Sequence, residues 1–278
     1  MDDVPTGNEA LEIGLWKLYR RFFNQAERRR RWNLEADIPW SQCRRDLNPA
    51  IADVVESFCA IELYLPDYLQ HAMSRSRPSR ARTWFYANWG YEESKHSLAL
   101  GDWLLQSGSR TEEQMADVEG LVSAHVYKLP HESTAGMLAY AMVQERATAL
   151  NYRNLKRRTS EQGGDPALEK LLTLISVDEQ SHYSFFQDAI KLYLNHDPES
   201  TLEQLRDVMN GFSMPAIHEL ADGARRVARI KELDIFGEEH YYREVYIPIL
   251  DSLGIDRARL RNRIRTRKSA PLPPVVDV

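Results

Sequence analysis

The chain has 278 residues, of which 43% are apolar and 28% charged, a composition typical of a globular protein that excludes disorder over the whole length. Its 36 basic and 41 acidic residues give a net charge of −5, which excludes a global basic field for nucleic acid or anionic membrane. Because the sequence has two cysteines, an acidic N-terminus and no apolar run of membrane-spanning length, we expect a soluble cytoplasmic protein without disulfides or a transmembrane segment.

The apolar periodicity is helical almost throughout the chain. We expect helices over residues 9–31, 48–73, 80–107, from 111 onward, 132–159 and 165–194, with shorter ones near Pro198 and Pro215. Residues 32–47 are irregular. Asn48 and Asp165, each followed by proline, predict two N-caps, and Thr111 with Gln114 predicts a capping box.

No stretch alternates with the period of a β-strand, so the fold class is all-α, with four unusually long central helices. We expect one domain over residues 1–268. The Pro-rich tail over residues 269–278, SAPLPPVVDV, is expected to be disordered.

Several carboxylates fall on helix faces that are otherwise apolar. They are Glu62, Glu93, Glu145 and Glu179, one on each of four successive helical stretches. An isolated buried carboxylate costs several kcal/mol or more, so four of them require a common compensation, for which metal ions are the obvious candidate.

Two of these glutamates have a histidine three residues later, as His96 and His182, so glutamate and histidine project from one helix face. A single Glu-x-x-His motif is weak and occurs on many surface helices. Two motifs, each preceded by a core-facing glutamate 31 or 34 residues earlier, form the ligand set of a di-iron or di-manganese site in a helix bundle. This set suits iron and manganese equally.

Four sequence blocks resemble the soluble acyl-acyl-carrier-protein desaturases, the plant stearoyl type and its bacterial relatives. The blocks are Glu62-Leu-Tyr-Leu-Pro66-Asp-Tyr68, Trp89-Gly-Tyr-Glu92-Glu93-Ser-Lys-His96, Gln144-Glu145-Arg146-Ala147-Thr148 and Asp178-Glu179-Gln-Ser-His182. The resemblance implies a ferritin-like four-helix bundle core with additional flanking helices and two iron ions per chain. It makes Glu62, Glu93, His96, Glu145, Glu179 and His182 the ligands, with Glu93 and Glu179 bridging the metals.

The resemblance also implies roles around the metals. The Thr148 hydroxyl would pass protons to the centre, although bonding back to its own helix carbonyl is an equally good interpretation. Asp178 would orient a ligand histidine, which we expect to be His96. Trp32 would lie at the outer end of that hydrogen-bonded chain, with Trp40 as its competitor.

The implied activity is the O2-dependent introduction of a cis double bond into a fatty acyl chain in fatty acid biosynthesis. The acyl chain would arrive on acyl carrier protein, and a ferredoxin-type donor would supply two electrons to a homodimeric enzyme. Acyl carrier protein is acidic and needs a basic docking site, which we expect at Arg75, Arg77, Arg80 and Arg82. Two other basic clusters lie at residues 28–31 and 257–268.

Several alternatives stay open. Another di-iron oxidase, such as an acyl hydroxylase or an N-oxygenase, would use the same ligands. A ribonucleotide reductase small subunit is disfavoured because Leu100 stands where that family places a radical tyrosine. Two further hypotheses do not make the protein an oxidoreductase. It could store iron as ferritin does, or it could be a scaffold that has kept the ligands.

Overall fold

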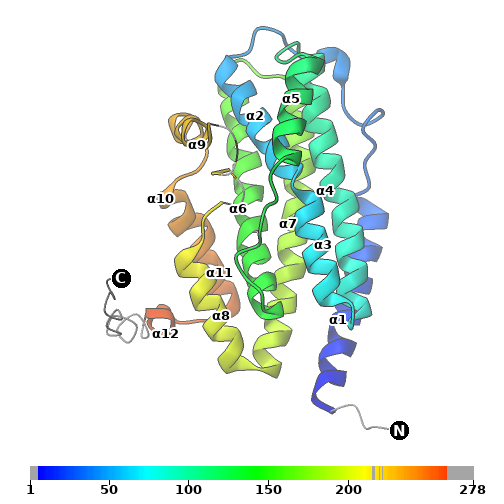
Figure 1. The fold of residues 1–278 in the computed structure, drawn as a ribbon, viewed down its shortest axis with the longest axis vertical. Helices are drawn as coiled ribbons and strands as arrows, with labels where there is room; N and C mark the ends of the chain where they lie inside the picture. Colours follow the sequence, from blue (N-terminus) through cyan, green and yellow to red (C-terminus); the bar gives the residue numbers. More distant parts are fainter. Residues whose placement is uncertain (1–5, 215–216, 219, 221, 262–278) are drawn as a thin grey trace, which may run out of the picture.

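The structure is a computed structural model, described for residues 6–214, 217–218, 220 and 222–261. Every regular element within those ranges is a helix, as the periodicity predicts (Figure 1). The elements are α1 (Thr6–Arg29), η1 (Trp40–Gln42), α2 (Pro49–Glu62), α3 (Leu65–Ser76), α4 (Arg80–Gln106), α5 (Glu112–Ser123), α6 (Thr134–Glu161), α7 (Pro166–His196), α8 (Pro198–Gly211), α9 (Gly223–Glu232), α10 (Glu238–His240), η2 (Tyr241–Tyr246), α11 (Ile247–Leu253) and α12 (Arg257–Arg261). The predicted Pro-rich tail and Pro215 lie outside the described residues.

The helix predicted over residues 48–73 is wrong in one respect, because it is two helices. α2 ends at Glu62 and α3 begins at Leu65. Pro66 has no N–H to donate to the carbonyl of Glu62, and its ring would clash with that carbonyl. The interruption therefore follows directly after the first predicted metal ligand.

The predicted helix boundaries are otherwise confirmed to within a few residues. Asn48 caps α2, the Thr111–Gln114 capping box opens α5, and Asp165 caps α7 through the N–H of Leu168 at 2.8 Å. Asp165 is fully buried and also accepts hydrogen bonds from Arg44 N and Trp103 Nε1. One carboxylate thus ties the start of α7 to α4 and to the loop that precedes α2.

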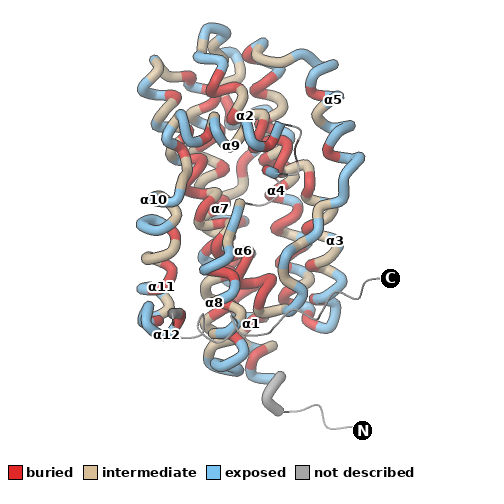
Figure 2. The backbone as a smooth tube through the Cα atoms, turned by 60° about the vertical axis from the view of Figure 1, so that its left-hand side comes forward, coloured by how far each residue is buried: buried red, intermediate tan, exposed pale blue. Residues whose placement is uncertain are grey.

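α4, α6 and α7, together with the α2–α3 pair, form the bundle, and α1 packs on α4 and α7 (Figure 1). The buried positions in Figure 2 gather along the inner sides of these long helices. Between α4 and α7, the rings of Phe85 and Phe185 stack with centroids 3.5 Å apart. The shorter helices α8–α11 flank α6 on one side (Figure 1). Among the described helices, none has both the length and the apolar character that crossing a membrane requires.

Candidate metal centre

The structure brings all six predicted ligands together in the middle of the bundle. They form two overlapping groups: Glu62, Glu93, His96 and Glu179, and Glu93, Glu145, Glu179 and His182. Within each group the potential ligand atoms lie within 4.8 Å of one another. Glu93 and Glu179 belong to both groups, which is the position that bridging ligands would occupy.

Several of the ligand atoms are buried and have no hydrogen-bond partner among the described residues. They are Glu93 Oε1, Glu145 Oε2, Glu179 Oε1 and His182 Nδ1. Leaving a buried polar atom unsatisfied costs about 1–3 kcal/mol, and more for a charged group. Oxygen and imidazole donors directed at one another in this way fit two divalent cations of the iron or manganese type.

The charges of the centre interact strongly. Burial, and then the nearby Glu93 and Glu179, raise the pKa of Glu62 well above its usual value. Burial and the charge of Glu179 do the same to the pKa of Glu145. Burial opposes ionisation of Glu179 as well, but the nearby side chains of Glu145, His182 and His96 outweigh burial and lower the pKa of Glu179. Without cations the centre therefore holds protons that bound metal would displace.

Both histidines turn the same ring nitrogen toward the carboxylates. His96 Nδ1 lies 3.0 Å from Glu93 Oε2, and His182 Nδ1 lies 2.9 Å from Glu93 Oε1. The opposite nitrogens face outer carboxylates, with His96 Nε2 at 3.4 Å from Asp178 Oδ2 and His182 Nε2 at 2.7 Å from Glu92 Oε2. A histidine that binds a metal usually donates its second N–H in this way, so Nδ1 is the atom that would face a bound metal.

Asp178 lies where the resemblance places it, between His96 and Trp32. Trp32 Nε1 donates to Asp178 Oδ2 at 2.7 Å, whereas Trp40 Nε1 donates to the carbonyl of Leu34. Burial would raise the pKa of Asp178, but the hydrogen bond with His96 and the neighbouring positive charges lower it to about 2. The carboxylate is thus held ionised and can orient the imidazole.

Glu92 is a residue that the sequence reasoning missed. It accepts from His182 and pairs with Arg30 and Arg31, while Arg30 also pairs with Asp178. Arg30, which the sequence places in a basic run, lies between the two outer carboxylates with its side chain 9% exposed. A signal was present: an acidic residue directly precedes each Glu-x-x-His motif, as Glu92 and Asp178.

We expect Glu92→Ala to weaken binding of the metal at His182 about 10–100-fold, the usual effect of losing such an outer partner. The ring would lose its acceptor, and Arg30 would lose one of its two counter-charges. Competition with a chelator, followed by metal analysis, measures this affinity. Glu92→Gln keeps an acceptor for His182 and should retain most of the metal affinity. Equal affinities in the wild-type protein and both variants would contradict the role assigned to Glu92.

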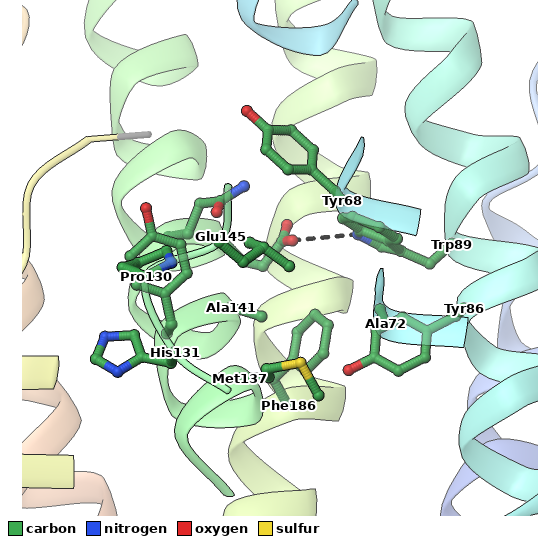
Figure 3. Close-up of a pocket in the computed structure, with 13 residues that line it drawn as sticks. Tyr68, Ala72, Tyr86, Trp89, Pro130, His131, Met137, Ala141, Glu145 and Phe186 are labelled. Atoms are coloured by element: carbon green, nitrogen blue, oxygen red, sulfur yellow. Dashed lines mark hydrogen bonds between the residues drawn. The ribbon is translucent and has the colours of Figure 1, made fainter. Parts of the chain in front are cut away.

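Thr148, Tyr152 and Trp89 also surround the centre. The Thr148 hydroxyl donates to the Gln144 carbonyl at 2.9 Å, the second interpretation considered above, and Thr148 also lines a cavity of about 20 Å³ beside the ligands. Tyr152 donates to Glu62 at 2.8 Å, and Trp89 Nε1 donates to Glu145 Oε1 at 3.1 Å (Figure 3). The roles of Tyr152 and Trp89 were not predicted from the sequence.

Apolar cavities lie on both sides of the ligands. One of about 30 Å³ extends past Glu145 between Tyr68, Met137 and Phe186 (Figure 3). A larger one of about 390 Å³ lies between α2, α6 and the flanking segment that includes α9. The small cavity beside the ligands shares Phe58, Ile61, Asn151 and Met214 with the larger one. These four residues therefore lie between the larger cavity and the centre.

The predicted docking arginines do not form one surface. Arg75 and Arg77 are exposed, and Arg80 stacks on the ring of Trp16 at 4.1 Å. Arg82 does not join them, because its side chain is buried and pairs with Glu12 at 3.5 Å. The cluster lies where α3 ends and α4 begins, on the opposite side of the bundle from α9 (Figure 1).

The model of the family described as "Fatty acid desaturase" matches residues 60–256. DesA1 of Mycobacterium tuberculosis, named as an acyl-[acyl-carrier-protein] desaturase, is 24% identical over 241 residues, covering 79% of this chain and 70% of the relative. The seed-specific stearoyl-[acyl-carrier-protein] 9-desaturase of Brassica napus is 28% identical over 148 residues, covering 52% of this chain but only 36% of its own length.

Among solved structures, DesA2 of Mycobacterium tuberculosis matches with a TM-score of 0.66 at 18% identity, covering 88% of this chain and 95% of that one. An R2-like ligand-binding oxidase with a Mn/Fe cofactor matches with a TM-score of 0.60 at 19% identity, covering 87% and 94%. At these identities the two structures establish the ferritin-like fold alone.

Proposed function

The chain belongs to the fatty acid desaturase family, and from that premise we propose that it is an O2-dependent di-iron acyl-acyl-carrier-protein desaturase that introduces a cis double bond into a fatty acyl chain. The observation that carries the proposal is the convergence of six ligands in two groups that share Glu93 and Glu179. A storage protein or a scaffold would not need the apolar cavities on either side of them.

We assign the two groups to two iron ions per chain, with manganese accepted by the same donors. When bound, the metals would supply O2 activation and the removal of hydrogen from unactivated carbon. The chain's own residues hold the ligands in place: Asp178 and Glu92 orient the imidazoles, and Tyr152 and Trp89 orient Glu62 and Glu145.

The larger cavity is proposed to hold the acyl chain. Its lining by Phe58, Ile61, Phe212 and Met214 offers an apolar surface that excludes water and leads to the ligands. Thr148, at the edge of the metal-side cavity, is proposed to pass protons there, because its hydroxyl oxygen can still accept while it donates to Gln144.

Acyl carrier protein is the proposed substrate carrier, and ferredoxin the proposed donor. Besides Arg75, Arg77 and Arg80, the exposed Arg225 and Lys231 of α9 are docking candidates, because Lys231 lines the larger cavity. Reversing the charge of Arg225 and Lys231 together should raise KM for acyl-carrier-protein substrates roughly tenfold. A variant with reversed charges at Arg75 and Arg77 serves for comparison. A larger rise in KM in that variant would place the carrier protein at Arg75 and Arg77 instead of α9.

The activity is tested with iron-loaded protein, reduced ferredoxin, O2 and a series of acyl-carrier-protein thioesters. We expect a cis-alkenoyl product, identified by mass spectrometry after derivatisation of the double bond. A hydroxylated product would instead assign an acyl hydroxylase. No oxidised acyl product from protein with two metals per chain would contradict acyl-carrier-protein substrates.

A further inference from the structure

One polar side chain lies where the larger cavity approaches the metal centre. Of the four residues that line both cavities, Asn151 is polar, whereas Phe58, Ile61 and Met214 are apolar. Asn151 is 2% exposed. Its Nδ2 lies 4.0 Å from Met214 Sδ, and its Oδ1 has no hydrogen-bond partner in the described part of the chain. Because a thioether sulfur is only a weak acceptor, the carboxamide can still both donate and accept.

The Asn151 side chain does not bond to its own helix. Other short polar side chains of α6 do, since Thr148 donates to the carbonyl of Gln144 and Thr159 to that of Leu155. A buried polar atom without a partner destabilises the fold, and most such atoms in native proteins are paired. The unpaired Oδ1 therefore points to a bound group that completes it.

The acyl chain proposed above would pass this carboxamide next to the ligands. The cavity of about 20 Å³ that Asn151 lines is also lined by four of the six ligands, Glu62, Glu93, Glu145 and Glu179. A substrate group bonded to Asn151 would thus lie beside the carbons to be oxidised. A methylene chain would leave the carboxamide unpaired, and a thioester carbonyl can accept from Nδ2 but has no proton for Oδ1. A hydroxyl donates and accepts.

The pantetheine arm that carries the thioester is a second source of a donor, through its amides. The lining of the larger cavity suits these amides where it meets solvent, because His218, Lys231 and Glu238 are exposed there. Most of the remaining lining is apolar, for example Val227 and Ile230. An amide buried against such side chains without a partner is unfavourable, which favours a hydroxyl at Asn151.

We propose that Asn151 is a specificity-determining residue that binds a hydroxyl group of the acyl chain, so that the substrate is a hydroxyacyl thioester. The hydroxyl lies on the carrier side of the oxidised carbons, donates to Oδ1 and accepts from Nδ2. A site built to bond a substrate hydroxyl discriminates against analogues without it, because its own polar atoms then stay unpaired. The inference rests on the proposed function for the acyl nature of the substrate.

The test measures affinity without turnover. Iron-loaded protein is titrated calorimetrically, without O2, with octadecanoyl-acyl-carrier protein and with hydroxyoctadecanoyl thioesters whose hydroxyl is moved along the chain. We expect one hydroxyl position to lower Kd about tenfold or more. Asn151→Leu, an apolar replacement of similar size, should abolish or reverse this preference. Asn154→Leu is the matched control and should keep it, because Asn154 donates to the carbonyl of Ile235 and lines neither cavity.

The wild-type protein alone decides the result if Asn151→Leu fails to fold, since equal Kd values for all thioesters would overturn the proposal. Equal weakening of every thioester in Asn151→Leu would assign the carboxamide to the pantetheine amides instead. A hydroxyl preference unchanged in Asn151→Leu would leave Asn151 to a water molecule, for which about 20 Å³ has room.

The same titrations with free octadecanoic and hydroxyoctadecanoic acids separate this inference from the proposed function. A hydroxyl preference among the free acids, together with no binding of the thioesters, would support the role of Asn151 and contradict acyl carrier protein as the carrier. Tight binding of the thioesters without a hydroxyl preference would overturn the role of Asn151 and leave the proposed function in place. No binding in either series would overturn both.

Discussion

Glu179→Ala is expected to abolish binding of both metals. Glu179 is buried and belongs to both ligand groups, so its loss removes one donor from each ion. The affinity should fall by more than the roughly 10–100-fold typical of an outer partner. Elemental analysis of protein loaded with ferrous iron and desalted measures the remaining metal per chain.

Glu113→Ala is the control for this experiment, because it removes an exposed glutamate from α5 and should leave two metals per chain. Circular dichroism should show both variants to be helical, since Glu179 supports no helix boundary. Two metals retained in Glu179→Ala would contradict the whole assignment, including the bridging role.

Asn151→Phe is expected to lower turnover of acyl substrates by more than about 100-fold, because a displacement near 1 Å at the reacting carbon costs that much. Asn151 is 2% exposed and lines both the larger cavity and the one beside the ligands. A phenyl ring there would occupy the passage between them. Turnover under saturating acyl-carrier-protein substrate measures the effect.

Arg153→Phe is the matched control, since it adds the same ring to an exposed position on α6. Both variants should bind two metals per chain, which separates a blocked passage from a damaged centre. Normal turnover in Asn151→Phe would mean that the substrate reaches the ligands by another route, for instance past Tyr68 and Met137.

Most helix boundaries could be predicted from capping residues alone, but one could not. Asn48, Thr111 and Asp165 were predicted as caps, and each makes the expected hydrogen bond to a backbone N–H nearby. The interruption at residues 63–64 was missed because the apolar periodicity continues across it. Pro66 was the available signal, because a proline has no N–H to bond to the carbonyl four residues earlier.

The surroundings of the ligands were predicted only in part. Asp178 and Trp32 came from the family resemblance, and their side chains make the expected contacts. Glu92 was missed although it precedes Glu93 as Asp178 precedes Glu179, because a single acidic residue at a helix position says nothing about its partner. Arg82 was predicted as a docking residue, but it is buried against α1.

The sequence by itself determined the all-α fold, the helices that carry the ligands and the pairing of Glu93 and Glu179 with a histidine one turn later. These features follow from the helical repeat, which relates residues only a few positions apart. The tertiary structure alone decided which imidazole nitrogen faces the carboxylates, that Arg30 joins Glu92 to Asp178, and where the cavities open. Such features depend on side chains that are far apart in the sequence, for example the 148 positions between Arg30 and Asp178, and these side chains meet only once the helices have packed.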